Sequence, residues 1–192
     1  VREHVPGMTL AEHIISQPSA KVEFSQFAAI FVQVIDGLNA IHELRNASGE
    51  SLQMVHAAIN PNSILLGRTG RVRITEPIFS AYNDRALDSH QLTRQQIEDY
   101  QAPELQDTPQ VSAMCDWYSL AITIVEFLGA ASAVKAVITN PSVESVKANI
   151  LSLSLMSQHD QLFECLCGLI TEPPAQRVEW SHQLRMILQE GL

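Results

Sequence analysis

The sequence predicts a mainly helical α+β domain that contains one small β-hairpin, and two patterns carry this prediction. Apolar residues recur at steps of three and four over residues 24–41, which is typical of the buried face of an amphipathic helix. Two short runs of strand-forming residues, 63–66 and 72–75, flank a Gly-containing turn at 67–70. We therefore expect a helical bundle with a small β-hairpin.

Before the hairpin, the sequence predicts a short helix, the long helix and a polar loop. Thr9 is a suitable N-cap and Glu12 stands three residues later, which is the capping-box pattern at the start of a helix. Residues 45–53 are rich in Gly, Ser and Asn, so they predict a reversal of the chain after the long helix.

After the hairpin, residues 79–101 are polar and aperiodic, which predicts an irregular functional loop. Residues 116–128 are apolar most of the way round a helix, and such a helix is normally buried at the centre of a domain. Further helices are expected at residues 131–139, 143–155, 161–170 and 181–188, with Pro141 and the pair Pro173-Pro174 between them.

Length and composition predict one globular domain over residues 1–192. The chain has 192 residues, of which 46% are hydrophobic and 17% charged. Its formal net charge of -9 argues against general binding to nucleic acid or to an anionic membrane, because both need a basic surface. Cationic peptides and basic protein patches remain candidate partners. No continuous apolar run of membrane-spanning length is present, so we expect no membrane insertion.

Cysteine and histidine usage predicts neither a disulfide framework nor a zinc site. The three cysteines, Cys115, Cys165 and Cys167, are an odd and sparse set, which suits a reducing compartment. The seven histidines are scattered singly, and none stands beside a cysteine pair. We expect buried structural thiols and no bound metal.

Seven segments resemble those of the protein kinase family, in the family's order and at its normal spacing. They are REHVPGMTL (2–10), GLNAIHE (37–43), VHAAINPNSILL (55–66), VRITEPIF (72–79), YQAPEL (100–105), DWYSLAITIVEFLGA (116–130) and EPPAQRVEW (172–180). The resemblance implies that residues 1–192 form a kinase-like C-terminal lobe. The N-terminal lobe, which grips the nucleotide in this family, would lie before Val1 and outside this chain.

Four positions that carry chemistry in the family hold other residues here. The resemblance places Ala58 at the catalytic aspartate, Asn60 at the catalytic-loop lysine and Ser63 at the magnesium-binding asparagine. Glu76 stands at the aspartate of D-F-G. Alanine cannot accept a proton, and a positioned base is worth on the order of 10²–10⁴ in rate. The sequence therefore predicts a pseudokinase, not an enzyme, with no bound cofactor.

The positions that hold the lobe together are retained. Glu104 and Arg177 resemble the family's buried ion pair, which ties the activation segment to the last helices. Asp116 resembles the aspartate that accepts hydrogen bonds from the catalytic-loop backbone, and His56 resembles the histidine that packs beneath it.

These patterns predict a catalytically inactive kinase-like domain that acts in protein–protein interaction or scaffolding. We expect it in the cytoplasm, with another protein or another domain of the same protein as its partner; the oligomeric state stays open. One alternative is a divergent Ser/Thr kinase fragment that uses Glu76 and an unusual base, with its N-lobe outside this chain. The other alternative is a structural or oligomerisation domain.

Overall fold

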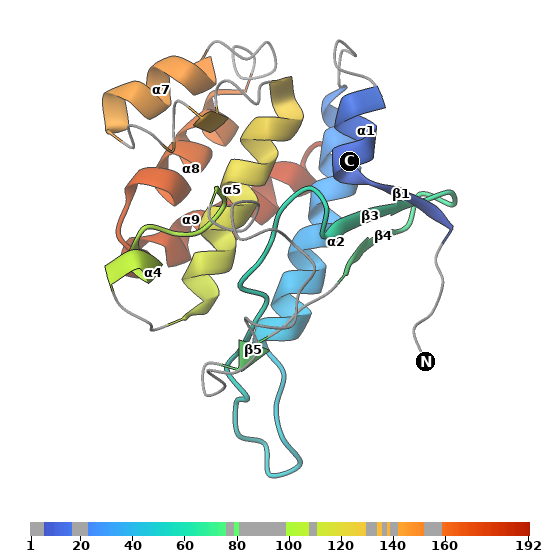
Figure 1. Cartoon of the computed structure of the whole chain (residues 1–192), viewed down its shortest axis with the longest axis vertical. Coiled ribbons are helices and arrows are strands. Elements are labelled where there is room, and N and C mark those ends of the chain that lie inside the picture. Colours follow the sequence, from blue (N-terminus) through green and yellow to red (C-terminus); the bar gives the residue numbers. More distant parts are fainter. Residues whose placement is uncertain are drawn as a thin grey trace.

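The computed structural model of the chain describes residues 6–16, 23–75, 79–80, 99–107, 111–129, 134–135, 138, 142–151 and 159–192. Its helices are α1 (Leu10–Ser16), α2 (Phe24–His42), α4 (Glu104–Asp107), α5 (Ala113–Gly129), α7 (Val143–Leu151), α8 (Asp160–Thr171) and α9 (Pro174–Gln189). Its strands are β1 (Gly7–Thr9), β2 (Met54–Val55), β3 (Ile64–Gly67), β4 (Val72–Ile74) and β5 (Phe79–Ser80). The mainly helical fold with a small hairpin is confirmed (Figure 1).

The predicted hairpin is β3–β4, and a third strand that sequence analysis did not predict extends it. β3 pairs antiparallel with β4, and β1 pairs antiparallel with the other edge of β3, with Met8 opposite Leu66. At Gly7 the two backbones approach so closely that an added Cβ would lie 2.2 Å from the Leu66 carbonyl oxygen. Only glycine fits such a position.

Helix α1 begins with the capping box that the sequence predicts. The backbone N–H of Thr9 donates to Glu12 Oε2 at 2.7 Å, and the backbone N–H of Glu12 donates to Thr9 Oγ1 at 3.1 Å. These two bonds satisfy amides that have no partner within the first turn of a helix. The Pro61 carbonyl accepts from the Ala11 N–H at 3.1 Å, so α1 also contacts the segment before β3.

Helix α2 is a core helix with the predicted apolar face. Phe27, Phe31, Ile35 and Leu38 are fully buried, and α2 packs against α9 and β4. By length and composition alone, α2 could also span a membrane, contrary to the sequence analysis. In the fold, its apolar face instead contributes to the hydrophobic core, and Asp36 on α2 pairs with Arg185 of α9 at 3.0 Å.

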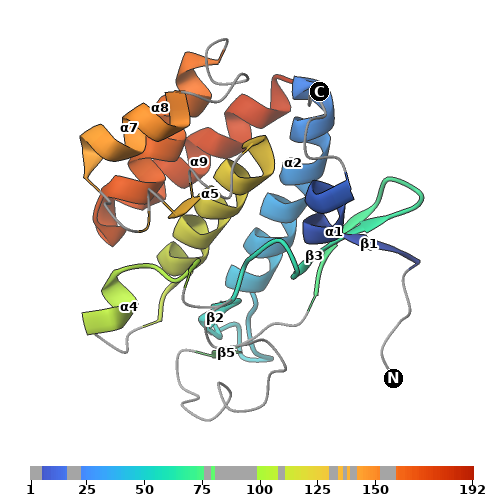
Figure 2. The ribbon, with the colours of Figure 1, turned by 45° about the horizontal axis from the view of Figure 1, so that its top comes forward.

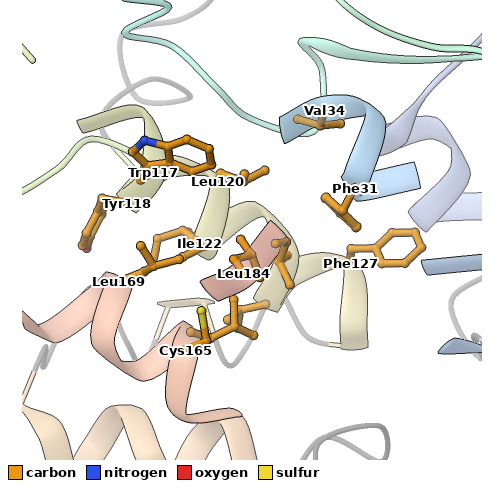
Figure 3. Close-up of a cluster of buried hydrophobic side chains, with 14 of the residues drawn as sticks. Phe31, Val34, Trp117, Tyr118, Leu120, Ile122, Phe127, Cys165, Leu169 and Leu184 are labelled. Carbon is orange, nitrogen blue, oxygen red and sulfur yellow. The ribbon is translucent and has the colours of Figure 1, made fainter. Parts of the chain in front are cut away.

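Helix α5 lies at the centre of the helical bundle, as its apolar sequence predicts. It contacts α8, α9 and β2, and Figure 2 shows α8 and β2 on opposite sides of it. Figure 3 shows Leu120 and Ile122 of α5 near Leu169 of α8 and Leu184 of α9. All four side chains are buried, so they form part of the core between α5 and the C-terminal helices. Because α5 also contacts β2, it joins these helices to the strand that leads into the candidate site.

Two helix starts differ from the sequence-based prediction by three residues or more, and parts of three predicted segments lie outside the described residues. α9 begins at Pro174 and not near residue 181, because proline is well placed in the first turn of a helix, where its missing N–H has no partner to lose. Pro174, which was expected only to separate helices, is instead the first residue of α9. α5 begins at Ala113, before the expected residue 116. Most of the expected helix 131–139 and of the loop 79–101, and the end of the expected helix 143–155, lie outside the described residues.

Candidate functional site

Asp116 is the buried centre of the candidate site. Its carboxylate accepts hydrogen bonds from the backbone N–H groups of His56, at 2.7 Å to Oδ2, and of Ala57, at 2.7 Å to Oδ1. The side chain is fully buried, and a buried carboxylate is tolerated when its oxygens accept strong hydrogen bonds. Asp116 thereby fixes to α5 the start of the catalytic-loop segment, which we define as residues 56–63.

His42 is a further member of the site that sequence analysis did not identify. Its Nε2 atom lies 2.8 Å from Asp116 Oδ2, and its ring stands edge-to-face with Trp117 at a centroid distance of 6.0 Å. His42 is in the last turn of α2, so this contact joins α2 to α5. The two residues are 74 positions apart in the chain, and no local pattern predicts such a contact.

The backbone of the catalytic-loop segment is strained at Ala57. Its φ of 60° lies in the left-handed region, which costs an alanine on the order of 1–2 kcal/mol. The hydrogen bond from its N–H to Asp116 offsets that cost. The next residue, the half-buried Ala58, presents a methyl group where the family carries a carboxylate.

His56 is fully buried, and both of its ring nitrogens have partners. Nδ1 lies 3.3 Å from the backbone N–H donor of Ala58, and Nε2 lies 3.3 Å from the Thr75 carbonyl oxygen. Since Nδ1 accepts, the neutral ring carries its hydrogen on Nε2 and donates it to Thr75. His56 therefore connects the catalytic-loop segment to the end of β4.

Asn60 and Ser63 are hydrogen-bonded to the loop that contains them. The Asn60 amide donates to the Ala58 carbonyl at 2.8 Å and accepts from the Asn62 N–H at 2.8 Å. Ser63 Oγ accepts from the Asn60 N–H at 3.0 Å and donates to the Asn60 carbonyl at 2.8 Å. The side chains thus close a local polar turn, as Asn and Ser commonly do.

These contacts test whether the described loop fits the magnesium ion that the family implies. Magnesium needs oxygen ligands directed at one point, and Ser63 Oγ is already used by the backbone of Asn60. Within the described residues, no three His, Cys, Asp or Glu side chains gather closely enough to hold a metal ion. The described loop therefore does not fit a magnesium site by itself, and Glu76 lies outside the described residues.

Glu104 and Arg177 form an ion pair between α4 and α9. Arg177 Nη1 of α9 is 2.5 Å from Glu104 Oε1 of α4, and the two side chains are 2% and 19% exposed. The guanidinium carbon also lies 5.2 Å from the centroid of the Tyr118 ring of α5. This cluster connects α4, α5 and α9.

Tyr100 and Glu126 form another, half-buried contact that sequence analysis did not identify. The Tyr100 hydroxyl donates a hydrogen bond to the Glu126 carboxylate, and Ser119 Oγ donates to the Tyr100 carbonyl at 2.7 Å. Burial raises the pKa of Tyr100 and the pKa of Glu126. These bonds anchor the segment before α4 to α5.

Comparison with known proteins gives one family and two relatives. The family model described as the protein kinase domain matches residues 1–186. Calmodulin-binding receptor-like cytoplasmic kinase 3 of Arabidopsis thaliana is 30% identical over 132 residues, which are 67% of this chain and 24% of that protein. Tyrosine-protein kinase MasK of Myxococcus xanthus is 24% identical over 99 residues, which are 52% of this chain and 15% of that protein. The chain thus matches less than a quarter of the length of either relative.

These comparisons contradict the prediction that the chain is a pseudokinase and not an enzyme. Both relatives are named as kinases, and the matching family is that of the protein kinase domain. The prediction relied on the groups missing at Ala58 and Asn60. Phosphoryl transfer depends mostly on positioning and electrostatic stabilisation, so one missing base lowers a rate by a finite factor and does not decide whether the chain is an enzyme.

The fold and the site agree with the family match. The helical bundle holds the catalytic-loop segment through Asp116, and the ion pair of Glu104 and Arg177 joins α4 to α9. The match covers 186 of the 192 residues, in a single stretch that includes both features. The chain belongs to the protein kinase domain family.

Proposed function

We propose that the chain is the C-terminal lobe of a divergent protein kinase whose nucleotide-binding small lobe lies outside this chain. The observation that carries this proposal is the pair of 2.7 Å hydrogen bonds from the backbone of His56 and Ala57 to Asp116. They hold the catalytic-loop segment against the central helix and maintain the unusual backbone of Ala57. A buried carboxylate is costly unless it is hydrogen-bonded, and here its hydrogen bonds hold one loop in an unfavourable backbone conformation. Such conformations are common at functional sites, which favours a functional role for this loop.

The role of this lobe in the proposed reaction is to position a hydroxyl group of a protein substrate. Transfer of a phosphoryl group needs the accepting hydroxyl held in line with the donor, and such positioning supplies much of the rate. Ala58 supplies no proton acceptor at this point. The proposed enzyme therefore works without the contribution of that base, and we expect it to be slow.

Phosphoryl transfer tests this proposal directly. The protein is prepared with the residues that precede Val1, and transfer from radiolabelled ATP to itself and to a mixed basic protein substrate is measured. Ala58→Asp restores a carboxylate at the position of the base, so we expect the rate to rise by a factor on the order of 10²–10⁴. Asp116→Ala removes the acceptor for the two loop amides, so transfer should fall to background.

Two controls separate effects on catalysis from general effects of substitution and from loss of folding. Asp36→Ala removes an exposed carboxylate on α2 and should leave transfer unchanged. Circular dichroism establishes that each variant is folded. If the parent protein and folded Ala58→Asp both fail to transfer phosphate, the proposal is wrong.

We also propose a cytoplasmic location. All three cysteines are free and buried, which suits a reducing compartment, and one relative is named as a cytoplasmic kinase. Fractionation of cells that express a tagged form of the protein tests this location. Recovery of the tag in the secreted fraction would contradict it.

A further inference from the structure

A groove lies on the surface formed by α8 and α9. Its lining includes three apolar side chains, Trp180, Met186 and Ile187, and three acidic ones, Asp160, Glu164 and Glu190. Its volume is about 520 Å³. Met186 is 57% exposed, so its side chain is accessible to a partner in the groove.

Trp180 forms a wall of this groove and of a second hollow beside it. The second hollow is lined by Glu172, Ala175, Gln176, Val178, Glu179, Trp180 and His182. Gly168 of α8 lets the indole lie against the helix, because an added Cβ there would be 2.3 Å from the Trp180 ring. Trp180 is half-buried, so part of its surface remains accessible to a partner. Tryptophan is among the residues that are enriched at hot spots of protein interfaces.

The rim of the groove is acidic. Three of its lining residues are Asp or Glu, two more acidic residues line the second hollow, and no Lys or Arg is among the described lining residues of either. Lys147 approaches from α7, where its Nζ lies 3.7 Å from Glu164 Oε2, but this pair is exposed and weak. Apolar side chains flanked by carboxylates, as in this groove, are complementary to a partner that is apolar on one face and basic at its flanks.

The groove is separate from the catalytic-loop segment. α5 contacts α8, α9 and β2, and in Figure 2 it lies between α8 and β2. Binding in the groove therefore does not require the proposed kinase activity.

We propose that the groove between α8 and α9 binds a basic amphipathic helix of another protein. Apolar side chains of that helix contact Trp180, Met186 and Ile187, and its Lys or Arg side chains pair with Asp160, Glu164 and Glu190. A second copy of this chain is a poorer occupant, because each copy carries a net charge of -9 and the acidic rims would repel.

A designed peptide tests this proposal. The probe contains only leucine and lysine, with the leucines on one helical face, and the control is a scrambled peptide of the same composition. Trp180 reports binding by its fluorescence, because the only other tryptophan, Trp117, is buried. We expect the amphipathic peptide to change the emission at low ionic strength and the scrambled peptide to bind at least tenfold more weakly, which corresponds to about 1.4 kcal/mol.

Matched variants locate the contact. Met186→Ala should weaken binding about tenfold, whereas Ile15→Ala, at an exposed isoleucine of α1, should not change it. The double variant Glu164→Gln with Glu190→Gln should weaken binding by roughly three- to tenfold. Glu43→Gln with Glu144→Gln removes the same charge elsewhere and serves as its control.

Each contrary outcome overturns the proposal. If the amphipathic peptide does not bind, the groove between α8 and α9 is not a binding site for a basic amphipathic helix. Equal binding of the scrambled peptide, or equal weakening by both charge-neutralising pairs, would mean general attraction to an acidic protein. If light scattering shows that the chain dimerises and that Met186→Ala disrupts the dimer, the occupant is a second copy.

Discussion

Arg177 Nη1 lies 2.5 Å from Glu104 Oε1, and this pair joins the last helix of the chain to the short helix α4. Arg177→Met should lower the free energy of unfolding by about 3 kcal/mol, because it leaves the Glu104 carboxylate in a mostly buried position without its cation. Urea denaturation of the variant and the parent measures the difference. The double variant with Glu104→Gln should lose less than the sum of the two single changes.

The exposed pair Arg185–Asp36 is the matched control. Its N–O distance is 3.0 Å, but its side chains are 39% and 51% exposed. Arg185→Met should therefore change the free energy of unfolding by less than about 1 kcal/mol. Equal losses of unfolding free energy in Arg177→Met and Arg185→Met would mean that burial does not strengthen the pair of Arg177 and Glu104.

His42→Phe should destabilise the fold by about 1–3 kcal/mol. Phenylalanine keeps an aromatic ring against Trp117 but cannot hydrogen-bond to the buried Asp116. The carboxylate then keeps only its two backbone donors. Urea denaturation gives the loss, and hydrogen exchange at the amides of His56 and Ala57 should become faster. Unchanged exchange at both amides would contradict a role of His42 in holding the loop.

The elements that sequence analysis predicted well are those set by local patterns. The capping box of Thr9 and Glu12, the apolar face of α2 and the Gly-containing turn of the hairpin each depend on neighbours in the chain. Strand β1 escaped detection because three residues carry no periodicity, and its structure depends on pairing with β3. The predicted start of α9 was too late in the chain, because proline usually interrupts a helix. Pro174 does not interrupt α9, since it lies in the first turn.

The candidate site was predictable only as far as the family resemblance reached. That resemblance identified the positions of Asp116, Glu104 and Arg177, which the structure places in close contacts. It did not reveal His42, nor the hydrogen bonds that Asn60 makes within its own loop. Contacts across many residues depend on how α2 and α5 pack, and no pattern within either helix encodes them. Residue identities at Ala58 and Asn60 also proved insufficient to decide whether the chain is an enzyme.

Glu126 should make stability depend on pH in the weakly acidic range. Burial raises its pKa above the ordinary 4.5, so the folded state holds the proton more tightly than the unfolded chain does. Its contribution to stability is therefore complete below 4.5 and declines as the pH rises through the higher folded pKa. Glu126→Gln keeps an acceptor for Tyr100 and removes this titration. We expect the unfolding free energy of the variant to fall less steeply than that of the parent as the pH rises. Parallel curves would contradict the raised pKa.

The three cysteines should be unreactive in the folded protein. Burial raises the pKa of Cys115 to about 11 and those of Cys165 and Cys167 to about 12. Because the thiolate is the reactive form, at pH 8 these thiols are both inaccessible and almost fully protonated. Ellman's reagent should label none of them within the time in which free cysteine reacts completely, and all three after unfolding in guanidinium. Rapid labelling of one thiol without denaturant would mean that the packing around it opens readily, and a Cys165→Ala variant would show whether the reactive thiol is on α8 at the contact with α9.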